Sequence, residues 1–537
     1  MDPIPLPPPT GGVNQKVPKF SLQSPYAEKL LNWNISTTVI STRKADGLFK
    51  EETTSPNPTI MAISAREEPF SSGCILVMMM NSVTREIQLW RVDSLGVTLI
   101  LFGAFMAVTP VSFSTSYFRG YNYFFWSDGT NQYALKYDGT GVTVAGYTFG
   151  GPAILAYGGA AVYKNRHYIP KAKSAGFYYS DIDAVTGACF FTDLSSVTNS
   201  PAYLINIATF TLADTVAAQE VIAFIFSDGL VLFYTGSFPG GADWTKAGVA
   251  KISNPYNLDS GTNYQGDYVI ANEQGIVSLR DLFLKGSEQA ASLTVNSNVN
   301  EDWQRFVALY PPSTGYVVGA LFDNRKQRLL FDFPLSFEDP RGSPYGINWF
   351  ILNIDSDTLL PWNLHECNGL LAPSTCRRAV VWNGGIYYIT LRQQAVTGAV
   401  LSGFRVIKKE ELATNLYDVG SGEAASGLPI RWDYISAPVA NGRLYVQKCD
   451  GLDVLLTSDV AANIKYELIP DFGAYTSNGP PTLPQNTTAL QKAFVNIGIE
   501  ASFIQYRIYG DSPNTTDAVG MTLYGVNFWV EQGRMPR

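Results

Sequence analysis

Short runs of β-forming residues, separated by two-residue turn signals, recur along most of this 537-residue chain. The turn signals are Asp-Gly and Asn-Gly dipeptides, which tolerate the positive φ angles of tight antiparallel hairpins. Four hairpins are predicted, the first three of which contain such a dipeptide: 221–226 with 230–234, 379–382 with 386–390, 436–440 with 444–448, and 502–509 with 521–530. A chain with this pattern of many short strands and tight turns is restricted to a β-sandwich, a β-barrel or a β-propeller.

Two sets of these runs have the length of a propeller blade. The first set contains residues 74–80, 86–92 and 97–101, and the second contains residues 111–118, 121–126, 132–137 and 142–145. Blade repeats span about 40–50 residues, and a closed ring of blades leaves few exposed strand edges. We therefore predict an all-β, propeller-based fold with additional small β domains or loops and very little helix. The repeat is degenerate, so the sequence leaves the number of blades open.

The chain is expected to divide into three regions. Residues 1–50 are predicted to form an extended, Pro-rich arm and the first strands. Residues 51–410 are predicted to form the propeller body with inserted loops, and residues 411–537 to add strands that close the propeller and form a platform. Five prolines between residues 3 and 9 hold the arm near the polyproline II conformation. The arm is either a flexible tail or a strap that lies on a neighbouring subunit.

A few segments have helical or apolar character. Residues 26–33 and 408–414 are each predicted to form a short helix. The longest apolar stretch, residues 97–111, contains Gly103 and Pro110 and is too short to span a membrane. Two buried strands with a turn near Gly103 are expected there instead.

Composition indicates the compartment and excludes one class of partner. Residues 1–5 have neither the basic nor the apolar region of a signal peptide, so none is expected. The five cysteines are odd in number and widely spaced, which favours reduced thiols and cytoplasmic synthesis. Lys and Arg total 38 against 46 Asp and Glu, a net charge of −8, which excludes a strongly basic nucleic-acid-binding face.

Candidate catalytic residues are few. The sequence contains only two histidines, His167 and His365, and no Gly-x-Ser-x-Gly motif, so a catalytic triad is not expected. His167 is predicted to be a structural or surface residue beside a strand turn. His365 with Cys367 and Cys376 has the residue types of a zinc site but lacks a fourth ligand and the usual spacing.

Other binding motifs are incomplete as well. Residues 353–357 begin like a calcium loop, but Thr358 stands where the loop needs glycine and Leu364 where it needs glutamate. An acidic hairpin turn is expected there. The chain has no phosphate-binding loop and no dinucleotide fingerprint. We therefore expect no catalytic, cofactor-binding or metal-binding residues.

Two groups of charged residues require separate consideration. The basic cluster of Lys164, Arg166, Lys171 and Lys173 is predicted to be a solvated face. The 46 acidic residues leave one enzymatic alternative open, because propeller glycosidases place carboxylates around the central channel without a local motif. The Asp-box repeat of sialidases, Ser-x-Asp-x-Gly-x-x-Trp, is absent.

A series of spaced motifs runs along most of the chain. In order, they are Gly11-Gly12-Val13-Asn14, Arg43-Lys44-Ala45-Asp46-Gly47, 162–166 with 177–181, 232–237 with Trp244, Asn353 with Thr358 and Trp362, 430–438, 469–472, 506–510 and 523–529. In this order the motifs resemble those of the tail-nozzle, or distal tail-tube, proteins of short-tailed bacteriophages. The resemblance covers about residues 11 to 533, and the Pro-rich segment before Gly11 departs from it.

The resemblance implies a structural protein of the virion tail that is not an enzyme and needs no cofactor. It implies a homohexameric ring below the tail adaptor protein, around the channel through which the double-stranded DNA genome leaves. Such a nozzle also docks tail fibres or spikes and helps retain the genome before ejection. The alternative is a propeller glycosidase or a receptor-binding adhesin that acts on host surface glycans.

Overall fold

The computed structural model describes residues 3–532 with internal gaps. The gaps are 9–26, 32, 36–39, 43–44, 57, 67–72, 107–112, 128–131, 150–159, 172–173, 199–200, 214–217, 257–259, 294–302, 305–306, 309–310, 313–317, 339–345, 354–361, 367–378, 394–399, 413–416, 419–427, 430, 439–446, 459–464, 471–490, 502–503 and 512–520. Almost all of the described residues lie in β-strands and their connections.

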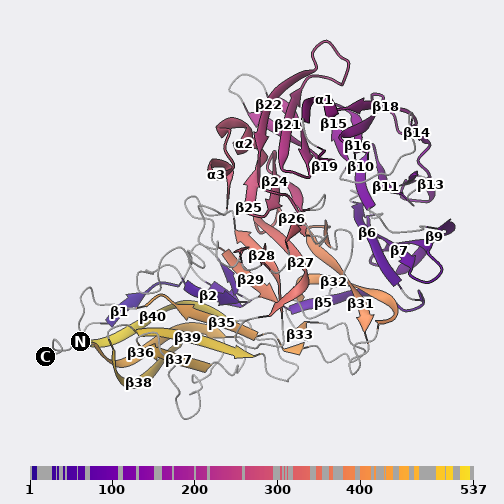
Figure 1. Ribbon diagram of the computed structural model, residues 1–537. Helices are drawn as coiled ribbons and strands as arrows, with labels where there is room; N and C mark the ends of the chain where they lie inside the picture. Colours follow the sequence, from indigo (N-terminus) through magenta and orange to yellow (C-terminus); the bar gives the residue numbers. More distant parts are fainter. Residues whose placement is uncertain are drawn as a thin grey trace.

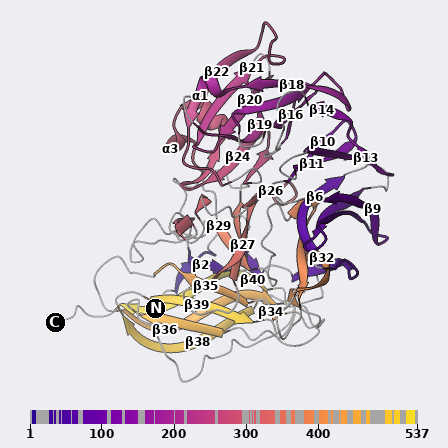
Figure 2. The same ribbon diagram turned by 45° about the vertical axis from the view of Figure 1, so that its right-hand side comes forward.

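Seven small sheets stand next to one another as the blades of a propeller (Figures 1 and 2). Blade I consists of β6–β9 (Pro58–Arg66, Cys74–Asn81, Glu86–Val92, Val97–Met106). Blade II consists of β10–β13 (Phe113–Phe118, Tyr121–Ser127, Gln132–Tyr137, Val142–Val144). Blade III consists of β15–β18 (Ala161–Tyr163, Arg166–Pro170, Gly176–Ser180, Gly187–Asp193), and β14 (Tyr147–Phe149) is its additional edge strand. Blades IV and V are β19–β22 (Leu204–Ala213, Ala218–Phe226, Leu230–Thr235, Thr245–Lys251) and β23–β25 (Gly261–Tyr264, Asp267–Asn272, Gly275–Ser278). Blades VI and VII are β26–β29 (Gly319–Asp323, Arg328–Glu338, Gly346–Asn353, Trp362–Glu366) and β30–β32 (Ala379–Trp382, Gly385–Gln393, Val400–Leu412) with β5 (Ala45–Glu52).

A hydrophobic cluster fills each junction between neighbouring blades, including the junction between blade VII and blade I. At the junction of blades III and IV, the rings of Phe177 and Phe224 stack with their centroids 4.5 Å apart. At the closing junction, Phe404 of blade VII lies edge-on to Trp90 of blade I at 6.2 Å. Apolar residues on both faces of the blades therefore bury one another around a complete ring.

The N-terminal part of the chain closes this ring. Strand β5 is the outer strand of blade VII, where it pairs with β32 so that Glu52 lies opposite Phe404. Blade VII thus contains strands that lie more than 300 residues apart in the chain. Backbone hydrogen bonds hold the two ends of the ring together, which adds to the hydrophobic contacts between blades.

The remaining strands form a platform, seen at the lower left of Figure 1. One of its sheets contains β3 (Trp33–Ile35), β4 (Ile40–Thr42), β40 (Met521–Gln532), β36 (Gln447–Ser458) and β38 (Gln491–Ala501) in that order, with β1 (Pro3–Leu6) paired to β40. The other consists of β2 (Ala27–Leu31), β35 (Arg431–Ser436), β39 (Ile504–Asp511) and β37 (Lys465–Pro470). Strands β33 (Tyr417–Asp418) and β34 (Leu428–Pro429) form a small separate pair.

The second platform sheet is continuous with blade VI. Strand β2 pairs in parallel with β29, where Leu31 lies opposite Leu364, and the hydrogen-bonded order β26-β27-β28-β29-β2-β35-β39-β37 forms one eight-stranded sheet. Behind this sheet, the buried Trp33 lies edge-on to Tyr434, whose hydroxyl is 2.7 Å from that of Tyr506. The propeller and the platform are therefore joined by a shared sheet.

The predicted fold class is confirmed: the described chain is all-β, with three short helices, α1 (Ser195–Thr198), α2 (Leu279–Lys285) and α3 (Glu288–Ala291). The predicted runs at 86–92 and 132–137 coincide with β8 and β12. The hairpins predicted at 221–234 and 379–390 form β20–β21 and β30–β31. No helix among the described residues is both long and apolar enough to cross a membrane.

Both predicted helices are wrong. Residues 27–31 and 33–35 form β2 and β3, and the segment around residue 408 belongs to β32, which extends to Leu412. The turn expected near Gly103 is also wrong, because β9 continues through Gly103 and pairs it with Ile87. In each case pairing with a neighbouring strand satisfies the backbone along the whole segment and overrides weak local preference.

One of the four predicted hairpins, 502–509 with 521–530, does not form, and the turn of another, 436–440 with 444–448, lies outside the described residues. Residues near 436 and 447 do lie in strands, but β35 pairs with β2 and β39, whereas β36 pairs with β38 and β40. Likewise β39 and β40 lie in different sheets. In a two-sheet platform a chain reversal also carries the strand to the opposite sheet, so a turn signal does not identify the partner.

Part of the Pro-rich arm pairs with a strand of its own chain. Its residues Pro3–Leu6 form β1, which pairs with residues 526–529 of β40 in the same chain. Strand β1 covers the part of that edge that β4 leaves open, and its prolines suit an edge strand because they have no N–H to donate.

Deletion of residues 1–8 is expected to lower the free energy of unfolding by only about 1–3 kcal/mol, because one short edge strand is lost. The uncovered edge of β40 is expected to cause irregular self-association, which light scattering and thermal unfolding would measure. The exposed-site variant Pro5→Ser, which keeps the strand, is the control. A truncated chain that matches this control in both measurements would contradict the proposed covering role.

Candidate functional site

The innermost strands of the blades surround two neighbouring cavities along the propeller axis. The first has a volume of about 360 Å³, and its lining residues come mainly from β10, β15, β19 and β23, with Tyr268 from β24. The second, of about 370 Å³, adds residues of β6, β26 and β30. Both cavities share Thr115, Ser116, Tyr117, Thr262 and Asn263, so they form adjoining parts of one central channel.

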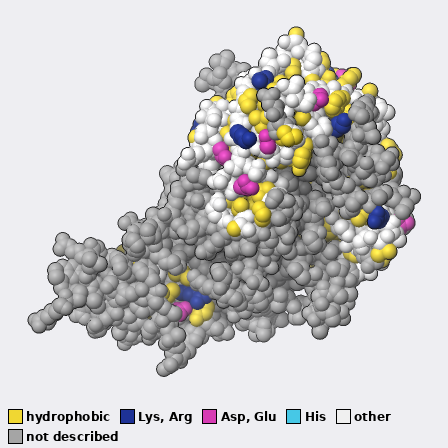
Figure 3. Space-filling view, viewed as in Figure 1, with side chains coloured by type: hydrophobic (Ala, Val, Ile, Leu, Met, Phe, Trp, Pro, Cys, Tyr) yellow, Lys and Arg dark blue, Asp and Glu magenta, His cyan; other side chains and the backbone are white. Residues whose placement is uncertain are grey.

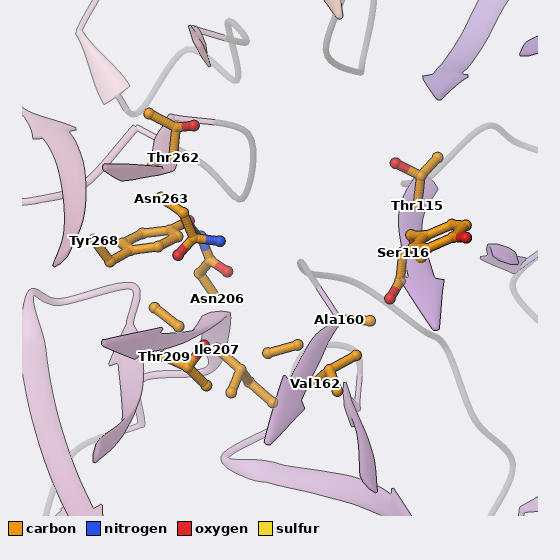
Figure 4. A pocket seen from close by; sticks show the side chains of 14 residues that line it. Thr115, Ser116, Ala160, Val162, Asn206, Ile207, Thr209, Thr262, Asn263 and Tyr268 are labelled. Carbon is orange, nitrogen blue, oxygen red and sulfur yellow. Dashed lines mark hydrogen bonds between the residues drawn. The ribbon is translucent and has the colours of Figure 1, made fainter. Parts of the chain in front are cut away.

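Polar side chains face one another across the first cavity (Figure 4). Thr115 and Ser116 project from β10 on one wall, while Thr262 and Asn263 project from β23 on the other. Asn206 lies beside the second wall and donates from its Nδ2 to the hydroxyl of Tyr268 at 2.7 Å. This hydrogen bond fixes the aromatic ring at the edge of the cavity.

Neither cavity is lined by Asp, Glu, Lys, Arg or His among the residues that the structure describes. The polar groups are hydroxyls and amides, which at neutral pH neither carry charge nor transfer protons readily. The lining therefore provides no carboxylate pair for glycosidic hydrolysis and no cation for phosphate.

Local geometry explains the glycine at the start of the inner strand β23. Blades converge on the axis, so the inner strands leave little space on either face. At Gly261 of β23, a Cβ atom would lie 2.4 Å from the ring of Tyr268, closer than any non-bonded contact allows. Only glycine at this position lets the tyrosine lie against the channel wall.

His167 lies behind the channel wall, between blades II and III. The side chain is completely buried, with its Nε2 2.7 Å from the Ser116 hydroxyl and its Nδ1 3.3 Å from that of Tyr147. The Tyr147 hydroxyl donates to the Ala184 carbonyl at 3.1 Å. The imidazole Nδ1–H therefore donates to the Tyr147 oxygen, and Nε2 accepts from Ser116.

The Ser116–His167 contact has the distance of a nucleophile–base pair but not its electrostatics. Burial away from water lowers the pKa of His167 to about 3. At pH 7 only about one imidazole in ten thousand would carry a proton, and no described carboxylate contacts Nδ1 to stabilise the charge. The histidine side chain contacts the wall strand β10 through Ser116 and is buried, so it is not the surface residue that was the other expectation from the sequence.

The predicted basic cluster does not form a single face. Lys164 is exposed and 3.3 Å from Glu220, while Arg166 is buried and bonds Asp181 at 2.8 Å. Lys171 lies over the ring of Phe191. Lys173 lies outside the described residues. These cations occupy separate environments because the tight turn at Lys164 reverses the chain, and this turn was predicted beside His167.

The metal-binding candidates are only partly described. His365 lies in β29, opposite Trp349, whereas Cys367, Cys376 and the calcium-like residues 354–357 lie outside the described part of the chain. Within the described part, no group of three or more His, Cys, Asp or Glu side chains is arranged to hold a metal ion. Cys74 and Cys189 are buried free thiols, and burial raises the pKa of Cys74 to about 11.

Sequence reasoning missed the channel residues. A detectable signal existed: the first strand of several blades contains uncharged hydroxyl or amide side chains, as in Ser114-Thr115-Ser116 and Thr262-Asn263. These short runs become a site only when the blades close around them.

No protein-family model matches the chain, and no curated protein matches it. Among solved structures, an exo-β-1,3-galactanase from Phanerochaete chrysosporium, with β-1,3-galactotriose, is 7% identical and covers 78% of this chain and 95% of that one. The TM-score of this match is 0.25. At that score the likeness carries no argument about reaction, ligand or assembly.

Proposed function

We propose that this chain is a structural subunit of the tail nozzle of a short-tailed bacteriophage. Six copies would form a ring at the distal tail, around the path of the leaving DNA. The ring would contact the tail adaptor protein on one side and fibres or spikes on the other. The described cavities, of about 360 and 370 Å³, hold small molecules rather than a duplex, so the conduit would lie between subunits.

The observation that carries this proposal is the eight-stranded sheet shared by propeller and platform. A subunit under the pressure of a packaged genome must transmit load without hinging. Hydrogen bonds that run unbroken from β26 to β37 resist such hinging better than a flexible linker between two domains.

The distribution of charge supports a conduit that does not bind DNA tightly. In Figure 3 the Lys and Arg side chains on the described part of this face are scattered, and some lie beside Asp or Glu side chains. The net charge of −8 per chain gives −48 for six copies. Each cation bound to phosphate would add a counterion-release term to the affinity, and a ring would multiply it. A channel wall that binds phosphate weakly would allow the DNA genome to pass.

The purified chain, alone or with its adaptor, is expected to form rings with six times the 58.8 kDa mass of one chain. Mass photometry would measure the mass, and negative-stain microscopy would show the sixfold ring. A chain that stays monomeric both alone and with the adaptor would contradict the proposal.

The same rings provide a second measurement. At physiological salt they are expected to bind duplex DNA weakly, with little change as salt is added. Tight binding that weakens steeply with salt would indicate a basic channel and would overturn this account of DNA passage. Release of reducing sugar from host polysaccharide would favour the glycosidase alternative instead.

A further inference from the structure

We propose that the first cavity of the propeller channel is a binding site for a neutral saccharide. The inference rests on the lining of the cavity and is independent of the proposed assembly. It assigns a ligand class to side chains that neither the ring nor the DNA path uses.

The lining matches the hydrogen-bonding chemistry of sugars. A sugar hydroxyl both donates and accepts, as do the hydroxyls of Thr115 and Thr262 and, between its two atoms, the amide of Asn263. These groups lie on opposite walls of the same cavity (Figure 4). A sugar ring, which carries hydroxyl groups around its periphery, would therefore find hydrogen-bond partners on both walls of the cavity.

The absence of charge in the described lining excludes other ligand classes. A phosphate or carboxylate in this cavity would lose water without gaining a cation, which is costly. An apolar ligand would leave the wall hydroxyls and amides without partners. A neutral, polar ligand avoids both costs.

One tyrosine supplies an aromatic surface to the site. Tyr117 lines both cavities and is 51% exposed, whereas Tyr268 is buried in the core between blades IV and V and supports the wall through its hydrogen bond from Asn206. The C–H face of a sugar packs well on an aromatic ring with a polar tip, and Tyr117 offers such a ring. The volume of about 360 Å³ lies within the usual range for small-molecule sites and suits a mono- or disaccharide.

The test is an immobilised panel of neutral disaccharides of glucose, galactose, mannose and rhamnose, with sialyllactose and mannose 6-phosphate as charged probes. The full-length chain is expected to retain at least one neutral probe and neither charged probe. Retention of no neutral probe, or of the charged probes only, would overturn the assignment.

Variants then locate the site. Thr262→Val and Asn263→Leu each remove hydrogen-bonding groups from the wall and are expected to weaken the retained disaccharide roughly tenfold. Thr143→Val makes the same change at an exposed position of β13 outside the channel and is expected to bind as the unaltered chain does. Asn263 is exposed, so its replacement is compatible with folding, which thermal unfolding would verify. Binding that survives both channel substitutions would place the saccharide elsewhere and contradict the proposal.

Discussion

Gly403→Ala is expected to destabilise the propeller by about 3–5 kcal/mol, because it combines backbone strain with overpacking. Gly403 lies in β32 with φ +90°, and its N–H donates to the Ser55 carbonyl at 2.8 Å. A Cβ atom there would lie 1.9 Å from the backbone oxygen of Glu52 and 2.8 Å from the Cα of Thr53. Backbone atoms cannot rotate away, so the end of β5 would have to separate from β32 and open the ring.

Gly120→Ala is the matched control for this substitution. Gly120 also has a positive φ, +83°, but a Cβ atom there meets nothing within 4 Å. The control should therefore cost only the left-handed backbone penalty of about 1–2 kcal/mol. Thermal unfolding would compare the two variants, and hydrogen exchange of the β5 amides would report opening of the closing strand. Equal destabilisation of both variants, with β5 still protected, would show that β5 does not close the propeller as described.

The stability of the protein is expected to fall as the pH drops below 6.5, in part because His167 is buried in its neutral form. The folded-state pKa is lowered from 6.5 to about 3. Above pH 6.5 the imidazole is neutral in both the folded and unfolded chain, so its contribution to stability is fully present. Between pH 6.5 and about 3 only the unfolded chain takes up the proton, which costs about 1.4 kcal/mol per pH unit.

His167→Gln removes this proton uptake and keeps a polar side chain beside Ser116 and Tyr147. The variant is expected to be less stable at pH 7.5, because Gln does not fill the space enclosed by the surrounding aromatic rings. Its stability should fall less steeply with pH, so that the difference between the two chains shrinks by about 2–3 kcal/mol from pH 6.5 to 4.5. Urea unfolding across this range would measure the two slopes. Carboxylates titrate in both chains and cancel in the comparison. Parallel slopes would contradict the burial of a neutral His167, as would titration near pH 6.5 of the imidazole proton signal that is missing from His167→Gln.

The sequence alone determined how neighbouring strands pair across the tight turns of several blades. At Lys164 and Asn165, for example, both φ angles are positive, +47° and +59°, and the two strands on either side pair directly. At Asp228-Gly229, Gly229 has φ +82° and a Cβ atom there would lie 1.9 Å from the Ile252 carbonyl oxygen. Such turns depend on a few adjacent residues, and their signals can be read locally.

The tertiary structure alone decided which distant segments meet. The pairing of β5 with β32 and the sharing of a sheet between β29 and β2 join residues far apart in the chain. Conversely, β39 and β40 are consecutive in the chain but lie in separate sheets. The channel wall and the burial of His167 follow from that closure, since both depend on residues from different blades. A strand edge offers the same backbone groups to any partner strand. The choice between partner strands therefore depends on which apolar faces can be buried together. This burial is a property of the whole ring of blades and cannot be read from a local run of residues.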